Sequence, residues 1–406
     1  MWRRPVHAVA ALCLVAGGAS CSERPPAASP APAPVPTAAP LPSSAAPSAS
    51  TPVSAPVDCA AGTLAGLSLE ERAGQALMIG TPVGSPRELE AAVRRYGLGG
   101  VFLAGRSTRS ADALRADITA LRSAAPVPPL VAADQEGGNV QTFKGADFPL
   151  MPTAERLGRG SPDKLRDTVR DSARRLHGIG VTVNLAPVAD TVPVSIGVGN
   201  PPIGAFHRQY GSDPGEVAAD VGTAVAASQG EGVLTVLKHF PGLGRVRANT
   251  DVSRDAVDAT TTATDPYLQP FAAGIRAGSA GVMISSARYP QLDRTGIATY
   301  SKPIITGLLR ERLGYDGLVM SDDVGAADAA AVVPVGERAV TFVAAGGDMV
   351  LTIRPQDAGP MADALVAEAR RSPSFDARLT DAARHVLAAK DRAGLLPCSS
   401  GAATGG

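Results

Sequence analysis

Leu318-Val-Met-Ser-Asp322-Asp323 shows the pattern that decides the fold: a short, mostly apolar run followed at once by acidic residues. Similar short runs recur along the chain, and helical stretches such as 111–123, 162–178, 214–230, 304–313 and 336–345 separate them. Apolar strands that alternate with helices indicate a parallel sheet whose outer face is covered. The candidate strands are Ala76–Gly80, Gly100–Leu103, Leu130–Ala133, Val181–Leu185, Leu234–Lys238, Gly281–Ser285, Leu318–Ser321 and Met349–Leu351.

These strand–helix units predict an α/β fold, a single (β/α)₈ TIM barrel, over residues 58–400. Ser68 is a suitable N-cap for a first helix that starts at Leu69, and the helix 373–394 is expected to close the domain. An open, doubly wound sheet is the alternative. Such a sheet would carry a glycine-rich phosphate loop after its first strand, and the segment 79–84 matches that loop poorly.

The N-terminus has the features of a lipoprotein signal peptide over residues 1–20. Arg3 and Arg4 precede the apolar segment 8–17, and Gly18-Ala-Ser-Cys21 resembles the box in which the cysteine is acylated. Plain secretion, with cleavage near Ala19, is the alternative. We expect a lipid anchor at Cys21 and a location on the extracytoplasmic side of the cell membrane.

The next segment, residues 21–57, is expected to be a disordered linker. It consists almost entirely of Ala, Pro, Ser, Thr and Val, which cannot bury enough apolar surface to fold. Prolines favour an extended chain, so this linker could reach about 110 Å at ~3.1 Å per residue. A tether of this length would let the barrel act within the cell wall.

Two cysteines, Cys59 and Cys398, stand at the ends of the expected domain. An even pair in an exported protein suggests a disulfide, and a closed barrel brings its termini together. Two unpaired thiols are the alternative.

The charge balance argues against a nucleic-acid partner, because Lys+Arg and Asp+Glu are 38 each and no strongly basic face is implied. The sequence carries no cluster of His, Cys and Asp typical of a metal site, so no cofactor is expected. We expect a monomer.

Polar residues follow four of the strands, at the end of the barrel where TIM-barrel enzymes carry their active sites. The segments are Asp134-Gln-Glu-Gly-Gly138, Pro187-Val-Ala-Asp190, Lys238-His239-Phe-Pro-Gly242 and Ser321-Asp322-Asp323. Lys238 next to His239 argues against burial of the histidine. Asp323 is expected to be structural and to cap the next helix. Asp190 and Asp348 fit a structural or a functional role equally well.

These motifs resemble those of glycoside hydrolase family 3, of the single-domain bacterial β-N-acetylglucosaminidase type. Arg208-Gln-Tyr-Gly and Ala345-Gly-Gly-Asp-Met-Val-Leu support the resemblance, which covers about residues 64–396. It implies that Asp322 is the nucleophile of a retaining glycosidase. It also implies that the hydroxyls of the sugar are held by Asp134, Arg208, Lys238 and His239, and that a cis peptide occurs at Phe240-Pro241.

One loop departs from the family pattern. The family places its general acid/base histidine in an Asp-Ser-His sequence, where this chain has Asn249-Thr250-Asp251. A carboxyl group can serve as the proton donor if its pKa is raised, and an ionised Asp322 nearby would raise it. We therefore expect Asp251 to be the acid/base and Asn249 to orient it. Alternatively, Asp251 only caps a turn.

A second departure concerns arginines that the family carries after Glu-Gly-Gly, where this chain has Asn139 and Thr142. The resemblance implies a retaining exo-β-N-acetylglucosaminidase that acts on β-linked N-acetylglucosamine glycans or muropeptides derived from peptidoglycan. Two alternatives stay open: a wall-glycan-binding lipoprotein with weakened catalysis, and a β-glucosidase of the same fold.

Overall fold

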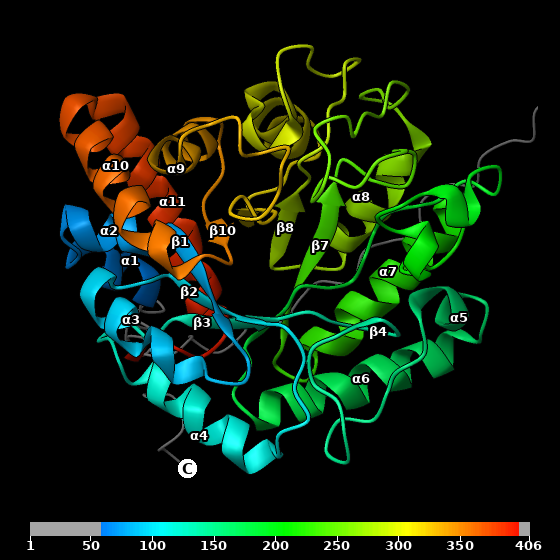
Figure 1. Cartoon of the computed structure of the whole chain (residues 1–406), viewed down its shortest axis with the longest axis horizontal. Helices are drawn as coiled ribbons and strands as arrows, with labels where there is room; N and C mark the ends of the chain where they lie inside the picture. Colours follow the sequence, from blue (N-terminus) through cyan, green and yellow to red (C-terminus); the bar gives the residue numbers. More distant parts are fainter. Residues whose placement is uncertain (1–57, 398–406) are drawn as a thin grey trace, which may run out of the picture. The chain divides into compact units, whose positions relative to one another are not determined.

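The computed structural model describes residues 58–397, and its central feature is a sheet of eight parallel strands surrounded by helices (Figure 1). The predicted signal peptide, the linker, Cys21 and Cys398 lie outside the described residues, so the anchor and the disulfide stay predictions. In sheet order the strands are β10 (Val350–Thr352), β1 (Leu77–Pro82), β2 (Gly100–Ala104), β3 (Leu130–Ala133), β6 (Val183–Asn184), β7 (Leu234–Phe240), β8 (Gly281–Ile284) and β9 (Leu318–Ser321).

The sheet closes on itself. Met320 at one end forms a parallel bridge with Met349 next to the other end, and the amide of Val324 donates to the carbonyl of Leu351 at 3.0 Å. This closure confirms the predicted (β/α)₈ barrel and excludes an open, doubly wound sheet. All eight predicted strands are present, with bounds that differ by up to two residues.

Side chains of alternate strand residues fill the barrel, as the two-residue period of a strand requires. In β9, Leu318 and Met320 belong to the inner cluster, whereas Val319 belongs to the outer layer under the helices. The inner cluster also takes Met78, Phe102, Leu130, Val183, Val236 and Leu351 from the other strands. The barrel is therefore a packed core, and a ligand site can form only at its ends.

The helices that surround the strands begin where the sequence predicts. Ser68 and Glu71 form a capping box at the start of α2 (Leu69–Gln75), and α6 (Pro162–Gly178) has the predicted bounds. The segment predicted as the helix 304–313 is a π-helix, Pro303–Arg312. The remaining helices are α1 (Cys59–Ala65), α3 (Glu90–Tyr96), α4 (Ala111–Arg122), α5 (Ala154–Gly158), α7 (Pro214–Gln229), α8 (Gln269–Arg276), α9 (Val335–Ala344), α10 (Ala358–Arg371) and α11 (Pro373–Arg392).

A short hairpin after β3 is not predicted by the sequence. Its strands are β4 (Gln135–Gly137) and β5 (Val140–Gln141), and its turn contains Gly138 with a positive φ of 54°. The hairpin continues the chain beyond the carboxyl end of β3. It therefore places the Asp134–Gly138 motif over the mouth of the barrel.

The opposite end of the barrel is closed by charged and polar side chains. Asp348 precedes β10 and is fully buried, with Arg310, Arg378 and His385 within hydrogen-bonding distance. Asp348 is thus part of the scaffold, a point that the sequence alone leaves open. Among the described residues, no helix combines the length and apolar composition needed to cross a bilayer.

Candidate active site

A cavity of about 510 Å³ opens at the carboxyl ends of the strands. Every residue for which the sequence predicts a catalytic or sugar-binding role lines it, although the residues come from five separate loops or strand ends. These residues are Asp134, Arg208, Lys238, His239, Asn249, Asp251 and Asp322. The chain therefore gathers the predicted polar groups in one place.

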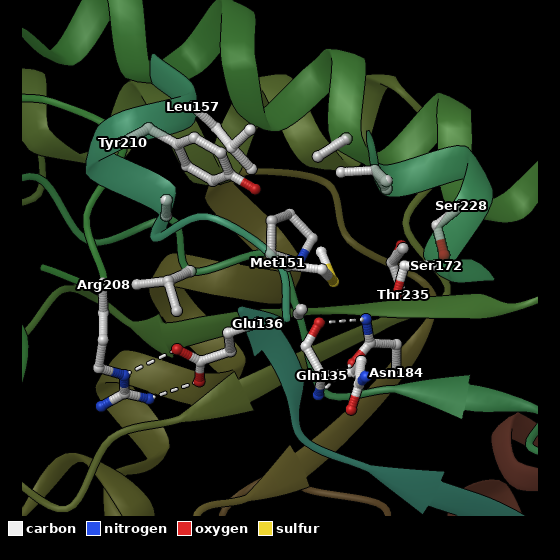
Figure 2. A pocket seen from close by; sticks show the side chains of 16 residues that line it. Gln135, Glu136, Met151, Leu157, Ser172, Asn184, Arg208, Tyr210, Ser228 and Thr235 are labelled. Carbon is white, nitrogen blue, oxygen red and sulfur yellow. Dashed lines mark hydrogen bonds and ion pairs between the residues drawn. The ribbon is translucent and has the colours of Figure 1, made fainter. Parts of the chain in front are cut away.

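The floor of the cavity is a cluster of two cations and two carboxylates. The Lys238 Nζ lies 2.6 Å from Asp134 Oδ1 and 2.6 Å from Glu136 Oε1. Arg208 donates to both oxygens of Glu136, from Nε at 2.8 Å and from Nη2 at 2.7 Å (Figure 2). Glu136 thus bridges the two cations, a role that the sequence does not predict for it.

Glu136 and Lys238 stay charged although both side chains are buried. Burial alone would raise the pKa of the Glu136 carboxyl, but Arg208 and Lys238 together outweigh burial and lower that pKa to about 2. Burial would likewise lower the pKa of Lys238, yet Asp134 and Glu136 raise it above its ordinary value. The result is a fixed set of charge-assisted donors and acceptors at the base of the cavity.

His239 is held by a buried carboxylate. Its Nδ1 lies 2.7 Å from Oδ2 of Asp190, which is fully buried. Lys238 and His239 are only 3% and 5% exposed, so the prediction that Lys238 would keep this segment from burial is wrong. A buried lysine is tolerated here because two carboxylates compensate its charge.

The backbone around this segment has two cis peptide bonds. The Phe240-Pro241 bond is cis, as the family resemblance implies, and so is the Lys238-His239 bond. The Leu243 amide beyond them donates to Asp190 Oδ1 at 2.7 Å. Asp190 therefore fixes both His239 and the start of the following loop.

Asp322 follows β9 and lies half-buried in the cavity wall. Its neighbour Asp323 accepts hydrogen bonds at Oδ1 from the amides of Gly325, Ala326 and Ile353. Asp323 is thus structural, as predicted, but the prediction that it caps a helix is wrong because a turn follows it. Burial and the adjacent Asp322 raise the pKa of Asp323 to about 6.

Asp251 lies at the outer part of the cavity, where its residue is solvent-exposed. The pKa of its carboxyl is raised, first by partial desolvation at the cavity wall and then by the charge of Asp322. The Asn249 side chain accepts a hydrogen bond from the Asp251 amide at 3.0 Å, and its hydrogen bond with the Asp251 carboxyl works against the rise in the pKa of that group.

Behind the floor lies a second, much smaller cavity of about 20 Å³ (Figure 2). It is lined by Glu136 and Arg208 on one side and by Met151, Leu157 and Tyr210 on the other. This volume holds about one water molecule, so it cannot hold a sugar. Its walls instead support Glu136 from behind.

Comparison with known proteins gives consistent results. Residues 68–389 match the model of the glycosyl hydrolase family 3 N-terminal domain. A β-hexosaminidase of Xanthomonas oryzae pv. oryzae is 35% identical over 264 residues, which cover 63% of this chain and 77% of that protein. A solved β-N-acetylhexosaminidase of Beutenbergia cavernae is 43% identical with a TM-score of 0.77, covering 80% of this chain and 99% of the other.

A further solved structure is the family 3 β-N-acetylglucosaminidase of Paenibacillus sp. FPU-7. It is 28% identical with a TM-score of 0.74, and the match covers 81% of this chain and 63% of that one.

Proposed function

This chain belongs to glycosyl hydrolase family 3, and from this membership and the geometry of the barrel mouth we propose that it is a retaining exo-β-N-acetylglucosaminidase. The observation that carries the proposal is the cavity in which a buried, ionised floor faces the two carboxyl groups of Asp251 and Asp322. A pair of carboxyl groups at a sugar-sized cavity is what glycoside hydrolysis requires.

In the first step, the Asp322 carboxylate attacks the anomeric carbon of the terminal sugar. The bond from this carbon to the glycosidic oxygen breaks, and Asp251 gives its proton to that oxygen as the remaining glycan leaves. In the second step, Asp251 takes a proton from water, whose oxygen attacks the anomeric carbon and releases Asp322.

The raised pKa of Asp251 supports its role as the acid. A proton donor must be protonated when substrate binds, and partial desolvation together with the Asp322 charge favours the protonated form. After Asp322 becomes an ester its charge is lost, which lowers the pKa of Asp251 and suits its second role as base. The carboxyl group thus replaces the histidine of related enzymes.

The floor of the cavity is suited to hold the terminal sugar. Asp134, Lys238, His239 and Arg208 present charged or polar groups that are already fixed by one another before substrate binds. Preorganised donors and acceptors lose little entropy on binding hydroxyl groups. Because the floor is closed, only the terminal sugar of a chain reaches the reacting groups.

The test is hydrolysis of p-nitrophenyl β-N-acetylglucosaminide by the purified full chain, with Asp322→Ala and Asp255→Asn variants. Asp255 is an exposed carboxylate in the Asp251 loop that does not line the cavity. We expect turnover by the parent and by Asp255→Asn, and a loss of at least 10³-fold in Asp322→Ala. Turnover of β-glucosides in preference to the N-acetylated substrate would instead indicate a β-glucosidase. An inert parent would favour a glycan-binding role.

The natural substrate and location are further parts of the proposal. A lipid on Cys21 and an extended linker would place the barrel near cell-wall glycan, which supports peptidoglycan-derived fragments as the substrate. Mass spectrometry of the mature N-terminus tests the anchor, and an unmodified start near Ser20 would contradict it. A mass two units lower than that of the reduced protein would support the Cys59–Cys398 disulfide.

A further inference from the structure

Two loops at the mouth of the barrel carry charged groups of the cavity. The Arg208 loop comprises residues 185–213, between β6 and α7, and the Asp251 loop comprises residues 241–265, after β7. Asn200 lies in the Arg208 loop and is fully buried. Its side chain joins the two loops.

Every hydrogen-bonding group of the Asn200 side chain has a partner. Nδ2 donates to the carbonyl of Leu243 at 2.8 Å and to the carbonyl of Val246 at 2.9 Å. Oδ1 accepts from the amides of Ile203 at 3.0 Å and Gly204 at 2.9 Å. A carboxamide has two N–H donors and one oxygen that accepts twice. The side chain therefore holds its own loop with its oxygen and the Asp251 loop with its nitrogen.

The oxygen of Asn200 holds the part of the loop that leads to the sugar-binding arginine. The carbonyl of Ile203 accepts from the Arg208 amide at 3.2 Å, and the carbonyl of Pro202 accepts from Arg208 Nη1 at 2.9 Å. Pro202 also lines the cavity. The turn that Asn200 fastens is thus the turn that positions both the backbone and the side chain of Arg208.

The nitrogen of Asn200 fixes the start of the Asp251 loop. Leu243 lines the cavity, and its amide donates to Asp190 Oδ1 at 2.7 Å, so buried side chains hold both its amide and its carbonyl. A Cβ on Gly244 would lie 1.8 Å from the carbonyl oxygen of Thr191, so the two loops are in direct backbone contact here. The start of the Asp251 loop therefore has little freedom to move.

The part of the loop that carries Asp251 is held by longer hydrogen bonds. The exposed Asp251 accepts at its carbonyl from the Asp328 amide at 3.3 Å, and the Thr250 carbonyl accepts from the Ala329 amide at 3.5 Å. Hydrogen bonds weaken as they lengthen beyond about 3 Å. Because the chain from Val246 to Asp251 is short, a shift at the start of the loop would be passed on to Asp251.

We propose that Asn200 is a positioning residue that sets where Asp251 lies relative to the sugar held by Arg208. The inference rests on the proposed glycosidase function, in which Asp251 gives its proton to the leaving oxygen. Asn200 does not line the cavity, so it acts through the two loops and not by contact with the substrate. A proton donor must lie within hydrogen-bonding distance of the atom that it protonates, so a small displacement of the loop is enough to slow the reaction.

The experiment compares two substrates whose leaving groups differ in their need for a proton: N,N′-diacetylchitobiose and p-nitrophenyl β-N-acetylglucosaminide. In the full chain, we expect Asn200→Ala to lower kcat/KM roughly 30- to 100-fold on the disaccharide and roughly three- to tenfold on the nitrophenyl substrate. The ratio of the two kcat/KM values should therefore fall. Asn200→Asp keeps an acceptor for the two amides but has at most one donor for the two carbonyls, so it should lower the ratio by less.

Gln141→Ala is the matched control. Gln141 is also a fully buried amide, which donates to the carbonyls of Phe143 at 2.9 Å and Pro149 at 3.0 Å and accepts from the Met151 amide at 3.0 Å. These bonds fasten the segment after β3, so any loss of activity in Gln141→Ala should be equal on both substrates. The proposal is overturned if the ratio falls equally in both variants, or if it stays at the parental value in Asn200→Ala.

Hydrogen–deuterium exchange separates this inference from the proposed function, because it needs no substrate. Peptides that cover residues 244–256 should exchange at least about tenfold faster in Asn200→Ala than in the parent, and at the parental rate in Gln141→Ala. Faster exchange together with an inert parent would uphold the link between the loops and place the failure in the proposed function alone. Unchanged exchange would overturn the inference even if activity falls. If Asn200→Ala does not fold, Asn200→Asp carries both measurements.

Discussion

Asp190 holds His239 by its ring and its backbone at the same time. Its Oδ2 lies 2.7 Å from Nδ1 of the ring, and both of its oxygens lie 3.2 Å from the His239 amide nitrogen. Because a carboxylate only accepts, the ring proton is placed on Nδ1, and Nε2 faces the Arg208 guanidinium at 3.5 Å. The buried carboxylate thereby sets the orientation of a side chain in the cavity.

Replacing Asp190 by Asn should therefore damage the site without touching substrate. An amide has only one acceptor oxygen for the contacts with His239 and Leu243, so at least one donor loses its partner. We expect kcat/KM to fall at least tenfold and the free energy of unfolding to fall by about 1–3 kcal/mol. Steady-state kinetics and urea unfolding measure these effects.

A double-mutant cycle with His239→Ala provides the control. If Asp190 acts through His239, its substitution should have little further effect on kcat/KM once the ring is absent. Additive losses would mean that Asp190 supports activity by another route.

Glu136 should make the fold sensitive to acid. Its folded pKa of about 2 lies below its ordinary 4.5, so its contribution to stability is complete above pH 4.5 and is lost as the pH falls towards 2. The side chain is only 4% exposed, and the contribution is on the order of 3 kcal/mol. Glu136→Gln should therefore be destabilised relative to the parent at pH 7.

The comparison is made by urea unfolding at pH 7 and at pH 3. The difference in the free energy of unfolding between the parent and Glu136→Gln should shrink at pH 3, because at this pH the parental carboxyl takes up a proton when the chain unfolds. Glu70→Gln removes an exposed carboxylate, and its effect should stay within about 0.5 kcal/mol at both pH values. An equal difference in the free energy of unfolding between the parent and Glu136→Gln at both pH values would be inconsistent with an ionised, buried Glu136.

Much of the fold could be predicted from the sequence because each strand of the barrel is a short buried run with a helix behind it. The sequence does not predict the hairpin after β3, because β5 contains only two residues, Val140 and Gln141, too few for a strand period to show. The π-helix Pro303–Arg312 was expected only as an ordinary helix, since both give a similar pattern of apolar residues.

The polar ends of the strands predicted which residues gather, but not how they pair. Glu136 could have been found, because Asp134 and Glu136 are two residues apart and an extended chain places such residues on one side. The burial of Lys238 could not have been predicted from the sequence, because lysine is rarely buried and its two carboxylate partners come from a distant segment. Pairing between loops depends on barrel closure, which a linear pattern does not display.

The pH dependence of activity should identify Asp251 as the acid. Its raised pKa keeps it protonated at higher pH than an ordinary aspartic acid, and kcat/KM should fall as the pH rises through this pKa. In Asp251→Asn this alkaline limb should disappear. The loss should be about 10²-fold or more on an unactivated disaccharide and smaller on the p-nitrophenyl substrate, whose leaving group needs less protonation.

Added azide gives an independent readout, because it can attack the glycosyl-enzyme intermediate without a general base. We expect azide to accelerate Asp251→Asn on the p-nitrophenyl substrate and to leave Asp255→Asn unaffected. An unchanged alkaline limb in Asp251→Asn would show that another group donates the proton, and the role of Asp251 would then be limited to the turn that it forms with Asn249.

Lys390 should make the stability of the barrel rise with pH. It is fully buried in α11, its Nζ lies 2.6 Å from Gln75 Oε1, and burial lowers its pKa from 10.5 to about 7. Between these two values the unfolded chain binds more protons than the folded chain, so unfolding becomes less favourable as the pH rises. We expect this residue to increase the free energy of unfolding by roughly 2–3 kcal/mol between pH 7 and pH 9.

Urea unfolding of Lys390→Met between pH 7 and pH 9 tests both the direction and the size of this change in the free energy of unfolding. Methionine keeps the length of the side chain without the charge, so the variant should lack this rise and its stability relative to the parent should be greatest at pH 7. Lys164→Met, which removes an exposed lysine of α6, should follow the parent. If parent and Lys390→Met show the same slope, the buried ammonium must be stabilised by more than the single Gln75 oxygen.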